Sequence, residues 1–128
     1  MRSDKGIELC KVGSMNADCL FCKIVAGSIP AKRVYEDDLC LCFADINPQA
    51  PTHLLILPKK HIASLAHAEE KDVALLGHLV AKAAEMARGA RLEQGYRVVI
   101  NTGADGGQTV DHLHLHLLGG RHMGWPPG

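Results

Sequence analysis

The chain has 128 residues, which suits one domain with a single hydrophobic core. Its 14 Lys and Arg residues balance 14 Asp and Glu residues, and 47% of the residues are hydrophobic. This composition excludes a disordered chain and a generally basic nucleic-acid-binding surface. No apolar run has the length of a membrane span, and the odd number of cysteines is a poor disulfide framework. We therefore expect a cytoplasmic protein that binds neither nucleic acid nor a membrane.

The first 14 residues differ in pattern from the rest of the chain. We expect residues 1–14 to be a disordered extension and residues 15–128 to form the domain. Within the domain, the segment from Asp18 to Gly27 predicts one short helix. Asp18 is suited to cap its start, and Gly27 is suited to end it.

Strands are predicted next. Residues 33–36 and 39–44 read as an antiparallel pair joined by a turn of two aspartates. The apolar run 53–57 ends at Pro58 and predicts a buried strand.

The second half combines one long helix with two more strands. Gly89 is suited to end the helix, residues 96–101 and 112–118 read as strands, and residues 102–108 form a glycine-rich loop. Mostly antiparallel strands with one long helix predict an α+β fold. The apolar face of the helix consists of Val73, Leu76, Leu79, Val80, Ala83, Met86 and Ala87.

Histidine and leucine alternate without a break from His112 to Leu117. Because side chains in a strand alternate between faces, we expect His112, His114 and His116 on one solvent-facing row and the leucines in the core. Imidazoles change charge near neutral pH, so such a row suggests acid–base or nucleophilic chemistry. Solvated surface histidines and a zinc site remain alternatives at this point.

Glycines and hydrogen-bond donors precede this row. A glycine-rich loop can turn its backbone N–H groups inward and bind an anion, although many such loops are plain turns. Beside a row of imidazoles, the loop indicates phosphoryl or nucleotidyl transfer. The residues are Asn101, Gly103, Gly106, Gly107, Gln108 and Thr109.

The segment His112-Leu-His-Leu-His-Leu-Leu118 resembles the signature of the histidine triad (HIT) superfamily. Residues 45–53, 58–62, 105–109 and 118–128 resemble its Hint branch, the histidine triad nucleotide-binding proteins. The resemblance extends from about Asp18 to the C-terminus. It implies a HIT fold: a mainly antiparallel five-stranded sheet with one long and one short helix, the sheet extended across a homodimer.

The resemblance also implies an activity. Hint proteins hydrolyse the P–N bond of purine nucleoside 5′-phosphoramidates, such as AMP linked to lysine, through a nucleotidyl-histidine intermediate. By motif position His114 is the nucleophile, His116 donates to a phosphoryl oxygen, and His53 supports the triad by hydrogen bonding. Thr109 stands where the family often has serine, and its hydroxyl is expected at the leaving nitrogen. The implied catalytic residues are His114, His116, His112, His53 and Thr109.

The same positions imply a nucleotide pocket for AMP or GMP. Asp45 accepts from the ribose hydroxyls, apolar residues enclose the base, and polar groups near residues 101–109 contact the phosphate. Trp125 is expected to reach toward the site of the partner subunit. The implied nucleotide-binding residues are Phe21, Ile24, Phe43, Asp45, Ile46, Asn101, Gly107, Gln108, Thr109, His114, His116 and Trp125.

Cys19 and Cys22 form a C-x₂-C pair, which in the cytosol indicates metal binding or redox chemistry. The alternative is a pair of reduced, partly buried thiols. Some superfamily members complete this pair with two histidines, and those positions match His61 and His112. The resemblance therefore implies a structural Zn²⁺ site formed by Cys19, Cys22, His61 and His112, with no metal required for catalysis.

Three other functions compete with the phosphoramidate hydrolase. One is hydrolysis of dinucleoside polyphosphates, a sister activity in the superfamily. The second is a nucleotide-binding adaptor whose catalysis is incidental, and the third is a catalytic zinc hydrolase. The tryptophan-containing tail and the loop at 105–109 favour the Hint branch.

Overall fold

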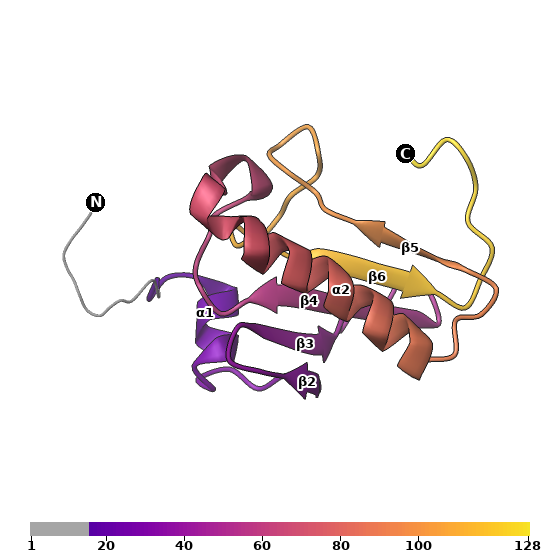
Figure 1. Ribbon diagram of the computed structural model, residues 1–128, viewed down its shortest axis with the longest axis horizontal. Helices are drawn as coiled ribbons and strands as arrows, with labels where there is room; N and C mark the ends of the chain where they lie inside the picture. The colour runs from indigo at the N-terminus through magenta and orange to yellow at the C-terminus, as the bar shows by residue number, and fades with distance from the viewer. Residues whose placement is uncertain (1–15) are drawn as a thin grey trace.

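The computed structural model describes residues 16–128, so the prediction for residues 1–14 lies outside the described part of the chain. Five antiparallel strands form one sheet in the order β2-β3-β4-β6-β5, and the long helix α2 crosses one face (Figure 1). The elements are α1 (Leu20–Val25), β2 (Arg33–Glu36), β3 (Cys40–Ala44), β4 (Thr52–Pro58), the 3₁₀ turns η1 (Leu65–His67) and η2 (Glu70–Asp72), α2 (Val73–Gly89), β5 (Tyr96–Val99) and β6 (Leu115–Gly119). This confirms the predicted α+β fold.

Helix α2 covers one face of the sheet. Its buried residues Leu79, Ala83 and Ala87 pack against the leucines of the histidine–leucine segment and against side chains of β3 and β4. Each fully buried leucine contributes about 1.5–3 kcal/mol relative to an exposed one, so this layer is a main source of stability. Among the described helices, none combines the length and apolarity needed to cross a membrane. The sheet residues of this layer are Cys40, Cys42, Ile56, Leu113, Leu115 and Leu117.

Helix α1 covers part of the opposite face. Phe21, Cys22 and Ile24 pack against the alternate side chains of β3 and β4, which are Leu41, Phe43, Leu55 and Leu57.

The start of α1 differs from the prediction. The cap is Cys19, whose thiol accepts from the backbone N–H of Cys22, and Asp18 lies outside the helix. Sulfur takes the place that the side-chain oxygen of Asp18 was expected to hold.

The histidine–leucine segment also differs from the prediction. Pairing of β6 with β4 begins at Leu115, opposite Ile56, so His112 and His114 precede the strand. The reason is local hydrogen bonding, because the amides of His112 and Leu113 donate to the carbonyls of Val110 and Ile62 instead of to a strand partner. The alternation of faces nevertheless continues through this extended segment.

Candidate functional site

The histidine row is buried, which corrects the expectation of a solvent-facing row. His112 is 0% exposed and His114 is 6% exposed, because α1 lies over them. The ring of Phe21 meets the ring of His114 edge-on, with 4.9 Å between centroids. Burial lowers the pKa of all three imidazoles, to about 4 for His112 and His116. The row is therefore electrically neutral at pH 7.

The tautomer of His114 is set by the backbone. Its Nδ1 lies 2.6 Å from the carbonyl oxygen of His112 and donates to it. A neutral imidazole carries one hydrogen, so Nε2 of His114 holds an unshared electron pair. An unprotonated nitrogen on a fixed ring is what nucleophilic attack requires.

His53 and His116 form a directed hydrogen-bonded pair. The backbone N–H of Gln49 donates to Nδ1 of His53 over 3.0 Å, so the hydrogen of His53 is on Nε2. That Nε2–H lies 2.9 Å from Nδ1 of His116 and donates to it. His116 therefore carries its own hydrogen on Nε2, which is buried and has no partner among residues 16–128. Asp45 Oδ2 lies 3.4 Å from Nε2 of His53.

Two cysteines and two histidines meet beside this row. Sγ of Cys19 lies 3.3 Å from Nδ1 of His112, and Sγ of Cys22 lies 3.3 Å from Nδ1 of His61 and 3.6 Å from Nδ1 of His112. The two Nδ1 atoms are 3.2 Å apart. All four ligand atoms lie within 4.8 Å of one another. Side chains from α1, the segment after β4 and the start of the histidine row thus converge on one point.

The geometry of this cluster fits a tetrahedral metal. Zinc bonds of about 2.3 Å to sulfur and 2.0–2.1 Å to nitrogen place neighbouring ligand atoms roughly 3.3–3.8 Å apart. His112 donates its Nε2–H to the carbonyl of Pro58 over 2.8 Å, which leaves the electron pair of Nδ1 directed at the two thiols. Burial raises the pKa of Cys22 to about 11, and a bound cation would reverse that shift. The four residues have the donor atoms and spacing of a closed structural site.

The glycine-rich loop is closed by its own hydrogen bonds. Gly103 and Gly107 have positive φ of 73° and 80°, and the amides of Gly107 and Gln108 donate to carbonyls inside the loop. The side-chain amide of Gln108 donates to the carbonyls of Ala63 and Val110 and accepts from the amide of Gly103. Gln108 thus has protein partners for its polar atoms. Asn101 is half-buried beneath the loop.

Thr109 is exposed and lines a hollow of about 550 Å³ beside Cys19 and His61. It follows the glycine-rich loop and lies on the side of the cluster formed by Cys19, Cys22, His61 and His112.

The residues expected around a base divide into two groups. Phe21 and Ile24 of α1 are buried together with Phe43 where the helix packs on the sheet, with 5.8 Å between the centroids of the two phenylalanine rings. Ile46 is 97% exposed and Trp125 is 83% exposed. The buried group borders the triad through the contact of Phe21 with His114, and the exposed pair lies on loops.

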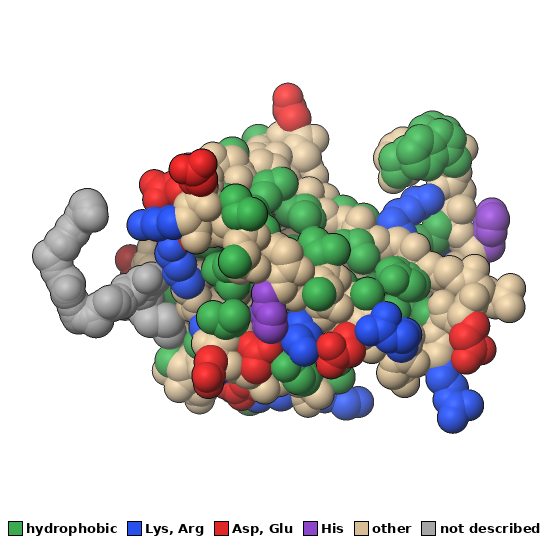
Figure 2. Space-filling model, in the orientation of Figure 1, with side chains coloured by type: hydrophobic (Ala, Val, Ile, Leu, Met, Phe, Trp, Pro, Cys, Tyr) green, Lys and Arg blue, Asp and Glu red, His purple; other side chains and the backbone are tan. Residues whose placement is uncertain are grey.

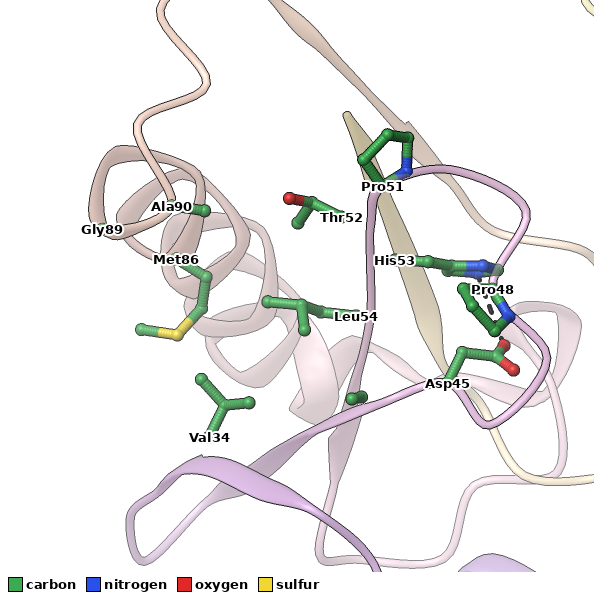
Figure 3. A pocket seen from close by; sticks show the side chains of 11 residues that line it. Val34, Asp45, Pro48, Pro51, Thr52, His53, Leu54, Met86, Gly89 and Ala90 are labelled. Carbon is green, nitrogen blue, oxygen red and sulfur yellow. Dashed lines mark ion pairs between the residues drawn. The ribbon is translucent and has the colours of Figure 1, made fainter. Parts of the chain in front are cut away.

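A second hollow of about 540 Å³ lies between the loop after β3 and the end of α2. Figure 3 shows Asp45 and His53 directed toward each other on one side of it, and Val34, Leu54 and Met86 on the other. Neither His114 nor His116 lines this hollow, so it is separate from the nitrogen atoms that carry the proposed chemistry.

Sequence reasoning missed the groups that orient the histidines. The carbonyls of Pro58 and His112 and the amide of Gln49 belong to the backbone, so no residue type signals them. It also missed the contact between His78 and Asp37, in which Nε2 of His78 lies 2.7 Å from Oδ2 of Asp37.

Comparisons with known proteins agree with this fold. The HIT domain family model matches residues 26–123, and the chain belongs to this family. A HIT-like protein of Synechococcus elongatus is 56% identical over 114 residues, which are 89% of this chain and 100% of that protein. A 14 kDa zinc-binding protein of Zea mays is 54% identical, with 85% and 87% covered. The crystal structure of a HIT family hydrolase from Legionella pneumophila superposes with a TM-score of 0.85 at 55% identity, over 87% of this chain and 100% of that one.

Proposed function

We propose that this protein is a nucleotide-binding hydrolase of the Hint branch that cleaves the P–N bond of purine nucleoside 5′-phosphoramidates. The observation that carries the proposal is the pair of tautomers at the site. His114 presents an electron pair on Nε2, and His116 presents an unpartnered Nε2–H, on rings whose centroids are 5.0 Å apart. A nucleophile beside a hydrogen-bond donor suits attack on an anionic phosphorus centre. The structural relative from Legionella is a HIT family hydrolase, which agrees with hydrolysis.

The proposed reaction has two steps. Nε2 of His114 donates its electron pair to the α-phosphorus, the P–N bond breaks, and a nucleotidyl-histidine forms as the amine leaves. The leaving nitrogen takes a proton from solvent as the P–N bond breaks, and the hydroxyl of Thr109 donates a hydrogen bond to it. Water then attacks the same phosphorus, releases the nucleoside monophosphate and restores neutral His114. The proton lost by the attacking water in the second step returns to solvent. His116 donates to a phosphoryl oxygen in both steps, where charge develops.

The nucleotide lies against the residues that surround His114 and His116. Asp45 accepts from the ribose hydroxyls, and the phosphate lies against polar groups at the end of β5 and in the glycine-rich loop. Trp125 reaches the site of the partner subunit from the C-terminal tail. The remaining contacts are base contacts from Phe21, Ile24, Phe43 and Ile46, and a phosphate contact from Asn101. Gly107 and Gln108 would contact the phosphate only where it displaces the hydrogen bonds that close the loop.

We assign a structural Zn²⁺ to Cys19, Cys22, His61 and His112. The distances among their ligand atoms support this, and a similar protein of Zea mays is a zinc-binding protein. When bound, the metal would fasten α1 to the start of the histidine row. The buried free thiols at Cys40 and Cys42 agree with a reducing compartment such as the cytoplasm.

We infer a homodimer joined through β5, and the two edges of the sheet support this inference. The β2 edge carries the ion-paired Arg33 and Glu36 and an irregular register, features that discourage pairing with another strand. The β5 edge instead exposes Tyr96 and Val98. Figure 2 shows hydrophobic side chains gathered over the face that α2 occupies, where Val80 is 53% exposed. A second copy pairing along β5 would cover this surface.

The direct test compares two substrates at equal concentration. We expect the protein to hydrolyse an AMP–amine phosphoramidate at least about 10-fold faster, by kcat/KM, than diadenosine polyphosphate. Mass spectrometry of the enzyme denatured at alkaline pH, where a phosphorus–imidazole bond survives, should detect AMP attached to His114. Faster cleavage of the diadenosine polyphosphate would overturn the proposal in favour of the sister activity, and binding without turnover of either would favour an adaptor.

A further inference from the structure

The three histidines of the row, of which His112 and His114 are buried and His116 is half-buried, are oriented by backbone groups in different surroundings. The carbonyl of Pro58, at the end of β4, orients the ring of His112. The carbonyl of His112, a residue that is 0% exposed, orients the ring of His114. The His53–His116 pair is oriented by the amide of Gln49, which belongs to the exposed loop between β3 and β4. Exposed loops move more than the strands they connect. The direction of the pair therefore depends on what holds this loop.

The loop is supported from outside by Arg121. Its Nε–H donates to the carbonyl of Gln49 over 3.1 Å, and its second nitrogen donates to the carbonyl of His122. The other hydrogen bonds of Gln49 are local, to the carbonyl of Asn47 and to Nδ1 of His53. Among residues 16–128, Arg121 is thus the one side chain from a distant segment that hydrogen-bonds to Gln49.

Arg121 is directed at the loop by the residue before it. Gly120 has a positive φ of 91°, and a Cβ there would lie 2.9 Å from Cβ of Pro51. The chain therefore leaves β6 in close contact with Pro51, in a conformation that suits glycine. This contact places the backbone of Arg121 beside the same loop that carries Gln49.

We propose that Arg121 is a positioning residue, whose Nε–H bond to the Gln49 carbonyl holds the Gln49 amide against His53 and so fixes the tautomers of His53 and His116. The inference rests on the proposed function in one respect, which is that the Nε2–H of His116 donates to a bound ligand. The effect of Arg121 on the two tautomers does not depend on that function.

The consequence of losing this bond follows from counting hydrogens. If the Gln49 amide withdraws, His53 is free to carry its hydrogen on Nδ1, and its Nε2 becomes an acceptor. It then no longer donates to Nδ1 of His116. His116 in turn gains the tautomer with hydrogen on Nδ1, and its Nε2 presents an electron pair to the site. An anionic phosphoryl group meets a repulsive lone pair in place of a donor.

The experiment compares Arg121→Met with Arg91→Met in the full-length protein. Both arginines line one hollow, so each variant removes one positive charge from the same region. Within residues 16–128, only Arg121 of the two hydrogen-bonds to the loop. Ring ¹⁵N chemical shifts report which nitrogen of each histidine carries the hydrogen. We expect Arg121→Met to populate the Nδ1–H form of His53 and His116 and Arg91→Met to leave both in the Nε2–H form. Arg121→Lys, which keeps a cationic donor, should restore part of the Nε2–H population.

Turnover gives a second measurement. Phosphoramidate kcat should fall about 3- to 10-fold in Arg121→Met, the effect of one hydrogen bond, with partial recovery in Arg121→Lys. Unchanged ¹⁵N shifts in Arg121→Met, or equal changes in Arg91→Met, would overturn the positioning role. If the wild-type protein hydrolyses no phosphoramidate, the proposed function fails, and the ¹⁵N shifts still decide the role of Arg121.

Discussion

His112 and His114 are two residues apart, and the backbone fixes them in opposite tautomers. His112 donates from Nε2 to the carbonyl of Pro58, whereas His114 donates from Nδ1 to the carbonyl of His112. The free nitrogen of His112 is therefore Nδ1, which faces the two thiols, and that of His114 is Nε2. One alternating segment can therefore supply both the proposed metal ligand and the proposed nucleophile, because the two rings use different nitrogens for their anchors. The residue proposed to ligate the metal also holds the proposed nucleophile through its carbonyl.

Replacing His114 with Asn should abolish turnover and leave nucleotide binding. Asparagine keeps a polar side chain but lacks the nucleophilic nitrogen, so phosphoramidate kcat should fall by roughly 10³-fold or more. The affinity for AMP, measured by calorimetry, should stay within about 10-fold, because the pocket is otherwise intact. His67→Asn, in the 3₁₀ turn η1, makes the same substitution at a histidine outside the row. It is the control and should keep full activity. Near-normal rates in His114→Asn would refute the nucleophile assignment.

Replacing Cys22 with Ser should remove the metal and destabilise the fold. Zinc-binding free energies of about 10–16 kcal/mol in small structural sites are free energies of folding, so we expect a loss above about 3 kcal/mol. Metal content by elemental analysis should fall from one zinc per chain, and the Tm should fall with it.

The control for the metal is Cys42→Ala, another buried thiol in the neighbouring core layer. It should cost about 1–3 kcal/mol of unfolding free energy through lost packing and keep the zinc. Chelation of the wild-type protein should lower the Tm before activity at low temperature declines. Immediate loss of activity at an unchanged Tm would indicate catalytic zinc instead.

Much of the fold was readable from periodicity. The apolar face from Val73 to Ala87 predicted α2, which spans Val73–Gly89, and the leucines at 113, 115 and 117 lie in the core as alternation requires. The prediction failed where hydrogen bonding, rather than patterning, decides. Nothing in the alternation of His112 to Leu117 shows that pairing with β4 starts only at Leu115, or that α1 covers the first two histidines.

The site was predictable only as a set of side chains. Motif positions named His53, His114 and His116, and the structure brings His53 and His116 into contact. The partners that choose their tautomers are an amide and two carbonyls, which every residue possesses, so only coordinates identify them. For the same reason the sequence does not indicate that Gln49 contributes its backbone, or that the polar atoms of Gln108 are taken up by the backbone of Gly103, Ala63 and Val110.

The acid side of the stability profile should depend on Asp37. Burial acts to raise the pKa of this carboxyl, but hydrogen bonds from Tyr35, the Leu39 amide, His78 and the Cys40 amide outweigh it and hold the pKa well below its usual range. The resulting stabilisation is fully present above the unfolded-state pKa of about 3.9 and is lost as the pH falls toward the folded-state value.

Asp37→Asn should therefore lower the free energy of unfolding by about 1–3 kcal/mol at pH 7. The difference from wild type, measured by urea unfolding at each pH, should shrink below about pH 4. Asp38→Asn makes the same charge change at an exposed neighbour and should cost less than about 0.5 kcal/mol at either pH. A difference for Asp37→Asn that stays constant down to pH 3 would show that the carboxylate charge is not responsible.

The dimer proposal predicts opposite results for two exposed valines on the two edge strands. Val98 on β5 is 37% exposed and Val34 on β2 is 51% exposed. Val98→Lys would place a charge in the proposed β5–β5 interface, where burying an unpaired ammonium costs several kcal/mol, and should shift the protein to monomer in analytical ultracentrifugation. Val34→Lys makes the same substitution at the other edge and should leave the mass that of a dimer. If Val34→Lys dissociates the protein and Val98→Lys does not, the interface lies at β2, and the charged, irregular edge is the one that pairs.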